Sequence, residues 1–207
     1  MSHTGPLILA STSVARRRLL ERLRIPFLTD APEIAETPQQ GETAAALAGR
    51  LAIAKAHAVA ARHQAGLVIG GDQTADCAGT LLNKPLSRTA ARAQLRSASG
   101  RRVVFHSGIC IVDAASGQCM HETVPVTVEF RKLDPQAIAR YVDCEPALHA
   151  AGSFHIEGLG VSLFERVSSD DPSSLVGLPL ITLCRLLRSF DYEVLDHASL
   201  ATPPDSR

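Results

Sequence analysis

The chain has 207 residues, of which 45% are hydrophobic and 20% charged, as in an ordinary globular protein. Basic and acidic residues number 21 each, so the formal net charge is zero. This balance excludes a global field that would attract nucleic acid or a membrane surface. No apolar run is long enough for a membrane span, and we expect a cytoplasmic protein with neither kind of partner.

The five cysteines are odd in number and widely spaced, without a C-x-x-C pair. This pattern favours reduced thiols over structural zinc or a disulfide framework. We expect residues 1–200 to form a single α/β domain and residues 201–207 to be a disordered tail.

Strand and helix patterns alternate along the chain, which predicts an α/β fold. In chain order we expect a strand at 7–10, a helix at 16–24, a strand at 25–28, a helix at 42–62, a strand at 67–70, a turn at 76–80, a return strand at 81–85, a helix at 89–97, a hairpin of strands 103–112 and 123–130, and helices at 135–143 and 175–190.

The segment after the first strand combines hydroxyls with arginines. Ser11 and Ser13 are candidate helix caps, and three arginines at 16–18 follow in the first turns. Cations are usually disfavoured at a helix N-terminus, because the helix dipole already places positive charge there. Three arginines make sense if an anion lies among them, held by backbone N–H groups, hydroxyls and guanidinium groups. The segment therefore predicts a phosphate site.

Asp72 follows two glycines at the predicted end of a buried strand. Open α/β sheets bind ligands at such strand ends, and glycine lets the backbone approach a bulky anion. The carboxylate could ligate Mg²⁺ or accept a proton from an attacking water. The alternative is an aspartate that caps the following turn, and position alone leaves both possibilities open.

Glu33 and Glu36 lie in the loop that follows the second predicted strand. Paired carboxylates that face a phosphate site suit a divalent metal, which reaches phosphates through one or two such groups. The alternative is a solvated acidic loop.

Only three of the 21 basic residues are lysines. Lys55 lies within the alanine-rich helix and Lys84 in the turn 83–85. A lysine on a helix face that is expected to be buried is a candidate phosphate ligand. The alternative is a side chain that extends along the helix to reach solvent.

The late segment 151–158 contains a histidine and a glutamate. If it is extended, Ser153, His155 and Glu157 share one face, and Phe154 and Ile156 share the other. Glu157, beside a glycine, would then be placed to read the edge of a nucleobase. We expect His155 to be a surface or packing residue.

These segments, from about residue 7 to residue 188, resemble the Maf family of nucleoside triphosphate pyrophosphatases in content and in order. The family's S-x-S-x-x-R pattern corresponds to Ser11, Ser13 and Arg16, and the acidic loop, the helical lysine and the aspartate also match. Its G-K-P turn corresponds to 83–85, its T-G pair to 107–108, and its V-G-L-P motif to 176–179. The resemblance implies a mixed, twisted central sheet flanked by helices, with two lobes and a cleft, similar to inosine triphosphate pyrophosphatases.

The resemblance also implies a hydrolase that releases a nucleoside monophosphate and pyrophosphate, with Mg²⁺ or Mn²⁺ as cofactor, and a possible homodimer. Asp72 would direct the attacking water. The implied phosphate-binding residues are Ser11, Ser13, Arg16, Lys55 and Lys84. The implied metal ligands are Glu33, Glu36 and Asp72.

Gln73, Glu157 and the segments around Glu157 resemble the branch of the family that acts on 7-methyl-GTP. The cationic 7-methylguanine base offers N1–H and N2–H₂ donors, which a carboxylate accepts well. Members of this branch carry an aromatic residue just before the arginine of the first motif, whereas this chain has Ala15. Base preference is therefore assigned to Ala15, Gln73 and Glu157.

Two alternatives remain within the family resemblance: a pyrophosphatase that prefers dTTP, UTP or CTP, and a nucleotide-binding regulator of septum formation and cell division. A pure binder would not need three carboxylates, which favours hydrolysis. A kinase or GTPase is disfavoured because the chain lacks a G-x-x-x-x-G-K-[ST] loop.

Overall fold

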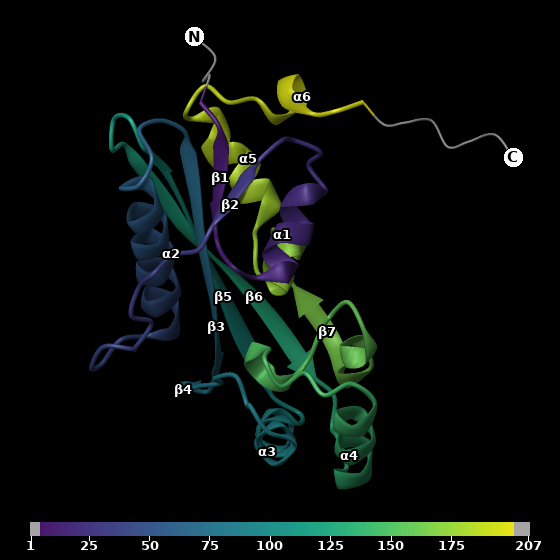
Figure 1. Ribbon diagram of the computed structural model, residues 1–207. Coiled ribbons are helices and arrows are strands. Elements are labelled where there is room, and N and C mark those ends of the chain that lie inside the picture. Colours follow the sequence, from purple (N-terminus) through teal and green to yellow (C-terminus); the bar gives the residue numbers. More distant parts are fainter. Residues whose placement is uncertain (1–4, 201–207) are drawn as a thin grey trace, which may run out of the picture.

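The computed structural model describes residues 5–200, so the predicted tail at 201–207 lies outside the described residues. Within this range, seven strands form one sheet in the order β2-β1-β3-β5-β6-β7, with β4 paired to β3 (Figure 1). The strands are β1 (Leu7–Ala10), β2 (Leu28–Asp30), β3 (Leu67–Cys77), β4 (Thr80–Leu81), β5 (Arg102–Asp113), β6 (Cys119–Phe130) and β7 (Phe164–Ser168).

Helices cover both sides of this sheet. The helices are α1 (Val14–Glu21), α2 (Ala44–Ala60), α3 (Arg88–Ala98), α4 (Pro135–Cys144), α5 (Leu180–Arg188) and α6 (Val194–His197), and the 3₁₀ turns are η1 (Ala151–Ser153), η2 (Leu159–Leu163) and η3 (Pro172–Val176). Strand β1 is parallel to β2 and β3, and the remaining pairs are antiparallel. The predicted mixed α/β class is confirmed.

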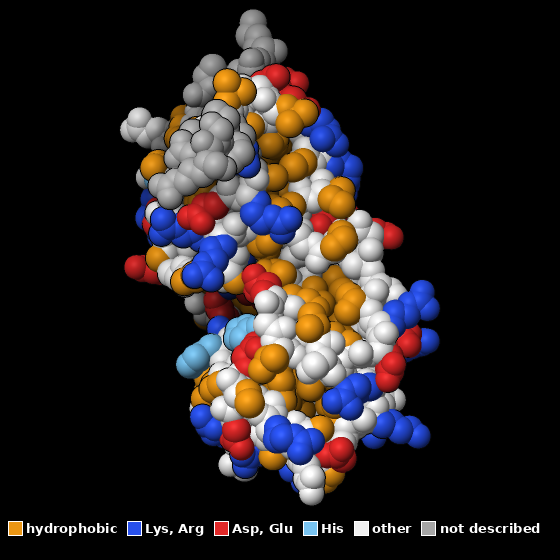
Figure 2. All heavy atoms as spheres, turned by 90° about the vertical axis from the view of Figure 1, so that its right-hand side faces the viewer, with side chains coloured by type: hydrophobic (Ala, Val, Ile, Leu, Met, Phe, Trp, Pro, Cys, Tyr) orange, Lys and Arg blue, Asp and Glu red, His pale blue; other side chains and the backbone are white. Residues whose placement is uncertain are grey.

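The long strands β3, β5 and β6 connect two lobes (Figure 1). In the upper lobe, Leu7 and Leu9 of β1 pack towards α5, while Ile8 and Ala10 pack towards α2 on the opposite face. Strand β1 is thus apolar on both faces, as expected for a parallel strand between helices. The surface in Figure 2 intersperses basic, acidic and apolar side chains, in keeping with the zero net charge.

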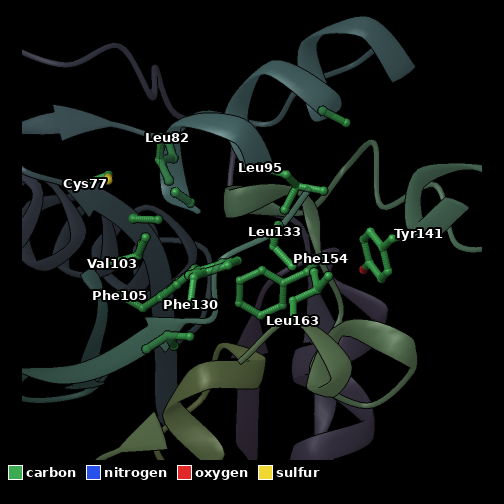
Figure 3. Close-up of a cluster of buried hydrophobic side chains, with 14 of the residues drawn as sticks. Cys77, Leu82, Leu95, Val103, Phe105, Phe130, Leu133, Tyr141, Phe154 and Leu163 are labelled. Carbon is green, nitrogen blue, oxygen red and sulfur yellow. The ribbon is translucent and has the colours of Figure 1, made fainter. Parts of the chain in front are cut away.

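The lower lobe has its own apolar cluster, formed by the far ends of the long strands with α3, α4 and the 3₁₀ turns (Figure 3). Phe154 lies at its centre, with its ring 5.3 Å from Phe105, 5.8 Å from Phe130 and 4.7 Å from Phe164, all in edge-on arrangements. Such arrangements favour contact between a ring edge and the face of its neighbour. This cluster fixes the lower lobe next to the site described below.

Several sequence predictions are confirmed. The helices α2, α3 and α4 lie within two residues of their predicted bounds, and β5 and β6 form the predicted hairpin. Thr43, Ser87 and Asp134 cap the three helices through their side-chain oxygens. No helix within residues 5–200 is both long and apolar enough to cross a membrane.

Other boundaries were wrong. The predicted strand 67–70 continues to Cys77, because its glycines do not form a turn. A side chain at Gly70 would collide with the backbone of Ala52 in α2, and one at Gly108 of β5 with the backbone of Ala48. The glycines instead let the alanine-rich helix lie directly against the sheet.

Most of the remaining differences occur at prolines, and the bounds of α1 are the exception. The predicted helix 175–190 is the turn η3 followed by α5, since Gly177 adopts φ 119° and Pro179 lies just before α5. The second strand begins at Leu28, after Pro26, rather than at residue 25. The return strand is only β4, because the chain turns away at Pro85. Helix α1 spans Val14–Glu21 rather than 16–24.

Candidate functional site

A cavity of about 670 Å³ lies between the two lobes. Its walls come from the loop after β1, the acidic loop, α2, the middle of β3, the turn after β4, the segment around η1, and the end of η3. It brings together all but one of the predicted site residues: Ser11, Ser13, Ala15, Arg16, Glu36, Lys55, Asp72, Gln73, Lys84 and Glu157. Glu33 does not line it.

The loop after β1 is shaped by its serines. Ser13 caps α1, with its Oγ 3.4 Å from the backbone N–H of Arg16. The Oγ of Ser11 accepts a hydrogen bond from the backbone N–H of Ser13 at 3.1 Å. Ser11 is buried, so this hydroxyl is held in one position at the start of the helix.

Arg16 is the arginine of this segment that reaches the cavity. Its Nε donates to the carbonyl of Gly177 at 2.9 Å, which aims the guanidinium. Burial lowers the pKa of Arg16, while the charges of Asp72 and Glu36 raise it. Arginine stays protonated throughout the accessible pH range, so a fixed positive charge faces the carboxylates.

The prediction that three arginines surround one anion was wrong. Arg17 is exposed and pairs with Glu21 on its own helix, with Nε and Oε1 3.0 Å apart. Arg18 is also exposed and lines neither this cavity nor a smaller one beside α1. Consecutive helical residues point about 100° apart, so three neighbours cannot face one ligand.

Lys55 forms the centre of the site. It is buried on α2, and its Nζ lies 2.6 Å from Oδ1 of Asp72 and 2.6 Å from Oε1 of Glu36. The alternative of a lysine that extends into solvent was wrong, because the side chain is only 7% exposed. An ammonium group has three N–H donors, so one remains for a further acceptor.

Asp72 lies in the middle of β3, where its side chain points towards α2. The turn-capping alternative is therefore wrong. Neighbouring residues of a strand point to opposite faces of the sheet, so the side chain of Gln73 lies on the other face. There the Nε2 of Gln73 lies 2.8 Å from the carbonyl of Ser174 and 3.1 Å from that of Leu175.

These contacts determine the orientation of the Gln73 amide. The two carbonyls can only accept hydrogen bonds, so the atom beside them must be the nitrogen. The hydroxyl of Ser107 donates to the same Ser174 carbonyl at 2.6 Å and lies 3.1 Å from Nε2. The amide nitrogen is thus occupied by protein groups, and the carbonyl oxygen is the end that can meet a ligand.

Glu36 is held by its surroundings in the ionised form. Burial alone would raise the pKa of this carboxyl, but the hydrogen bond and charge of Lys55, together with the charges of Lys84 and Arg16, hold it below its ordinary value. The acidic loop is fastened on both sides: Arg62 donates to the Ala31 carbonyl at 2.7 Å, and Arg50 donates to the Thr37 carbonyl at 3.2 Å.

The carboxylates fit a divalent cation as a pair rather than as a set of three. The bound oxygens of Glu36 and Asp72 share one nitrogen at 2.6 Å each, so they are at most twice that distance apart. Glu33 is exposed and lies outside the cavity, and within residues 5–200 no three His, Cys, Asp or Glu side chains are grouped to hold a metal. Two carboxylates suffice for Mg²⁺ when substrate phosphates complete its shell.

The segment around Glu157 is not extended, so the condition under which Ser153, His155 and Glu157 would share one face is not met. Gly152 and Ser153 both have positive φ, 75° and 65°, and they turn the chain into η1. Ser153 is buried, whereas His155 and Glu157 are exposed, so the three side chains do not share a face. Glu157 nevertheless lines the cavity.

Sequence reasoning missed a number of residues of the cavity wall, among them Leu86 and His149. Neither belongs to a motif with an evident chemical role. The one available signal was an apolar residue directly after the lysine-proline turn, where a polar loop residue would be ordinary.

Comparison with known proteins shows the family to which the chain belongs. Residues 6–190 match the family model described as Maf-like protein. The 7-methyl-GTP pyrophosphatase of Xanthomonas oryzae pv. oryzae (strain MAFF 311018) is 50% identical over 188 residues, which cover 91% of this chain and 98% of that protein. The protein of the same name from Aromatoleum aromaticum (strain DSM 19018 / LMG 30748 / EbN1) is 49% identical over 183 residues, 88% of this chain and 94% of that protein.

Among solved structures, the Staphylococcus aureus Ham1 protein is similar with a TM-score of 0.43 and 18% identity, over 60% of this chain and 71% of that one. The family match spans nearly all of the sheet and every cavity residue discussed above. The chain belongs to the Maf family.

Proposed function

We propose that the protein is a nucleoside triphosphate pyrophosphatase that hydrolyses 7-methyl-GTP to 7-methyl-GMP and pyrophosphate. The observation that carries the proposal is the single cavity in which Lys55 joins Asp72 and Glu36, with Arg16 and Lys84 beside them. The name shared by relatives that are about half identical to this chain supports the same reaction and the same base.

The cationic and hydroxyl groups of the cavity bind the triphosphate. Arg16 presents its terminal nitrogens, since Nε is already bonded to Gly177. Lys55 offers its third N–H, and Lys84 extends from the opposite lobe. The hydroxyls of Ser11 and Ser13 complete the phosphate contacts at the start of α1.

Asp72 orients the attacking water and accepts its proton. Its Oδ1 is bonded to Lys55, which leaves Oδ2 as the free acceptor. The water oxygen forms a bond to the α-phosphorus, the bond from that phosphorus to the bridging oxygen breaks, and pyrophosphate leaves with the electron pair. Arg16 and the lysines stabilise the charge that develops on the phosphoryl oxygens.

Glu36 and Asp72 are the residues that would hold a divalent cation, with the phosphates as its remaining ligands. When bound, Mg²⁺ or Mn²⁺ supplies additional positive charge for the transferred group and the leaving pyrophosphate. Glu33 has no place in this set, because it lies outside the cavity.

The base lies at the side of the cavity that carries Glu157 and the carbonyl oxygen of Gln73. Both are acceptors, and 7-methylguanine presents N1–H and N2–H₂ donors together with a positive charge. Ala15, a small residue, lines the cavity at the position where the family resemblance implies an aromatic ring.

The test is pyrophosphate release by the purified protein with Mg²⁺ or Mn²⁺, across 7-methyl-GTP, GTP, dTTP, UTP, CTP and ITP. We expect 7-methyl-GTP to have the highest kcat/KM, and a chelator to abolish turnover. Preference for dTTP, UTP or CTP would overturn the assigned base preference but would leave the proposed pyrophosphatase reaction in place. Tight triphosphate binding without turnover of any nucleotide would overturn the reaction and favour the regulatory alternative.

A further inference from the structure

Leu86 is an exposed apolar side chain inside the cavity. It is 67% exposed. Among the exposed large hydrophobic residues of the described chain, it is the one that lines this cavity. The others lie outside it: Val14, Leu28, Leu159, Val161, Val167, Ile181, Leu195 and Leu200. Exposed leucines are common on surfaces, but one in a cavity with fixed polar groups indicates a site for an apolar part of a ligand.

The backbone holds Leu86 in an uncommon conformation. Its φ is 57°, in the left-handed region that a bulky side chain rarely adopts. Its N–H donates to the carbonyl of Leu148 at 3.0 Å, which ties the turn after β4 to the segment before η1. Strained residues persist where the surrounding structure fixes them, and they are frequent at ligand sites.

A second connection fixes the same turn. Gln94 of α3 donates from Nε2 to the carbonyl of Asn83 at 2.7 Å, and its Oε1 accepts from the hydroxyl of Ser153 at 2.6 Å. The amide of Gln94 therefore links two segments of the cavity wall. One is the turn that carries Lys84 and Leu86, and the other is the segment that leads into Glu157. The position of Leu86 relative to the glutamate is thus set by hydrogen bonds on two sides.

The lower lobe contributes further apolar side chains to the cavity. Leu82, Phe154 and Ile156 line it and belong to the apolar cluster of that lobe, whereas Arg16 and Lys55 line it from α1 and α2. The flat face of the nucleobase is the apolar part of a nucleotide. When this face packs against the exposed leucine side chain, both apolar surfaces are removed from water.

We propose that Leu86 is a base-contact residue, whose side chain packs against the nucleobase of the bound triphosphate. This inference rests on the proposed function, because it takes the phosphates to lie at Arg16 and Lys55. An aliphatic side chain offers no hydrogen bond and no charge, so it strengthens the binding of every base alike. Leu86 therefore distinguishes nucleotides from inorganic triphosphate, whereas Glu157 distinguishes one base from another.

The experiment compares Leu86→Ala and Leu86→Met with Leu195→Ala, which removes a leucine that is 81% exposed and does not line the cavity. We expect Leu86→Ala to raise KM about tenfold for both 7-methyl-GTP and GTP, with kcat nearly unchanged. Leu86→Met keeps the apolar contact and should retain the original KM. The inhibition constant of inorganic triphosphate, which has no base, should be the same in all variants.

Leu86→Gly distinguishes loss of the side chain from strain in the backbone, because glycine adopts a positive φ without strain. It should raise KM as much as Leu86→Ala does. An unchanged KM in Leu86→Ala would overturn the proposal. So would a parallel weakening of inorganic triphosphate, which would mean that the substitution acts through the neighbouring Lys84.

Direct binding keeps this test separate from that of the reaction. If the unaltered protein binds 7-methyl-GTP but hydrolyses nothing, the proposed reaction fails. The base contact is then judged by dissociation constants, with the same tenfold difference expected for the nucleotide and none for inorganic triphosphate. Equal dissociation constants for the original chain and Leu86→Ala would overturn the contact even if hydrolysis were confirmed.

Discussion

The two walls of the cavity are built in different ways. The side chains at the centre of the wall assigned to the phosphates come from regular elements: Lys55 lies on α2, Asp72 on β3 and Arg16 on α1, and the loops that carry Ser11 and Glu36 adjoin them. The opposite wall is irregular, since Leu86 lies in a turn and Glu157 in the segment after η1. The side chains of the first wall are tied to one another or to main chain, whereas Leu86 and Glu157 project as exposed groups.

This difference follows from what each wall must recognise. Triphosphate is the same in every nucleotide, so fixed charges on rigid elements are suitable for it and for the reaction. Bases differ among nucleotides, and loops tolerate sequence change without loss of the sheet. We therefore expect substitutions in the first wall to affect turnover of every nucleotide, and those in the second to affect binding and preference.

Asp72→Asn tests the first wall most severely. The amide keeps the shape but cannot accept the proton, so kcat should fall about 10²–10⁴-fold for every nucleotide, while triphosphate binding remains measurable. The control is Asp76→Asn, a change on the same strand that does not line the cavity. Full activity of Asp72→Asn in steady-state pyrophosphate release would exclude Asp72 from the chemistry.

Arg16→Lys tests whether charge alone suffices in that wall. Lysine keeps the positive charge but loses the forked geometry and the Nε bond to Gly177. Loss of one or two charge-assisted hydrogen bonds, each worth about 1.5–3 kcal/mol, should lower kcat/KM by roughly tenfold to a hundredfold or more. Arg17→Lys is the matched control, one residue away and paired to Glu21 on the surface. Equal losses in both variants would contradict the assignment.

The first wall was largely predictable from the sequence. A lysine within an alanine-rich helix and an aspartate after a buried strand indicate polar groups on buried elements, and the structure places Lys55 and Asp72 in contact. The pattern could not show that Gly70, two residues before Asp72, serves helix packing. That role depends on the backbone of Ala52 in α2, which lies against Gly70 in the folded chain although it is remote from it in sequence.

The second wall was predictable only in part. Glu157 was singled out on the condition that its segment is extended, and the family resemblance supported it. The condition is not met, because two consecutive residues with positive φ precede the glutamate. Local alternation of polar and apolar residues resembles a strand even when tertiary contacts impose a turn. Leu86 was missed because its place depends on a tertiary contact: its backbone N–H donates to the carbonyl of Leu148, which is remote in sequence.

Glu157→Gln tests the second wall. The glutamine keeps one acceptor but loses the charge that attracts a cationic base. We expect the ratio of kcat/KM for 7-methyl-GTP over GTP to fall about tenfold, with a smaller change in kcat for the better substrate. Glu165→Gln, an exposed position of β7 outside the cavity, should leave the ratio unchanged. An unaltered substrate profile in Glu157→Gln would remove this residue from base recognition.

The smallest expected effect concerns Glu36, which joins the first wall from a loop. Its pKa in the folded protein is below the ordinary value, so between the two values the unfolded chain binds more protons. Its contribution to stability is therefore complete above about pH 4.5 and is lost as the pH falls through the lowered pKa.

Glu36→Gln should remove that part of the pH dependence. Because the Glu36 side chain is 54% exposed, solvent screens the pair, and the loss near pH 7 should be less than about 1 kcal/mol. Urea unfolding between pH 3 and 7 measures the free energy of unfolding and its pH dependence. Glu33→Gln is the control, because Glu33 is three residues away and outside the cavity. A steeper acid destabilisation in Glu36→Gln than in the original chain would reverse the predicted sign.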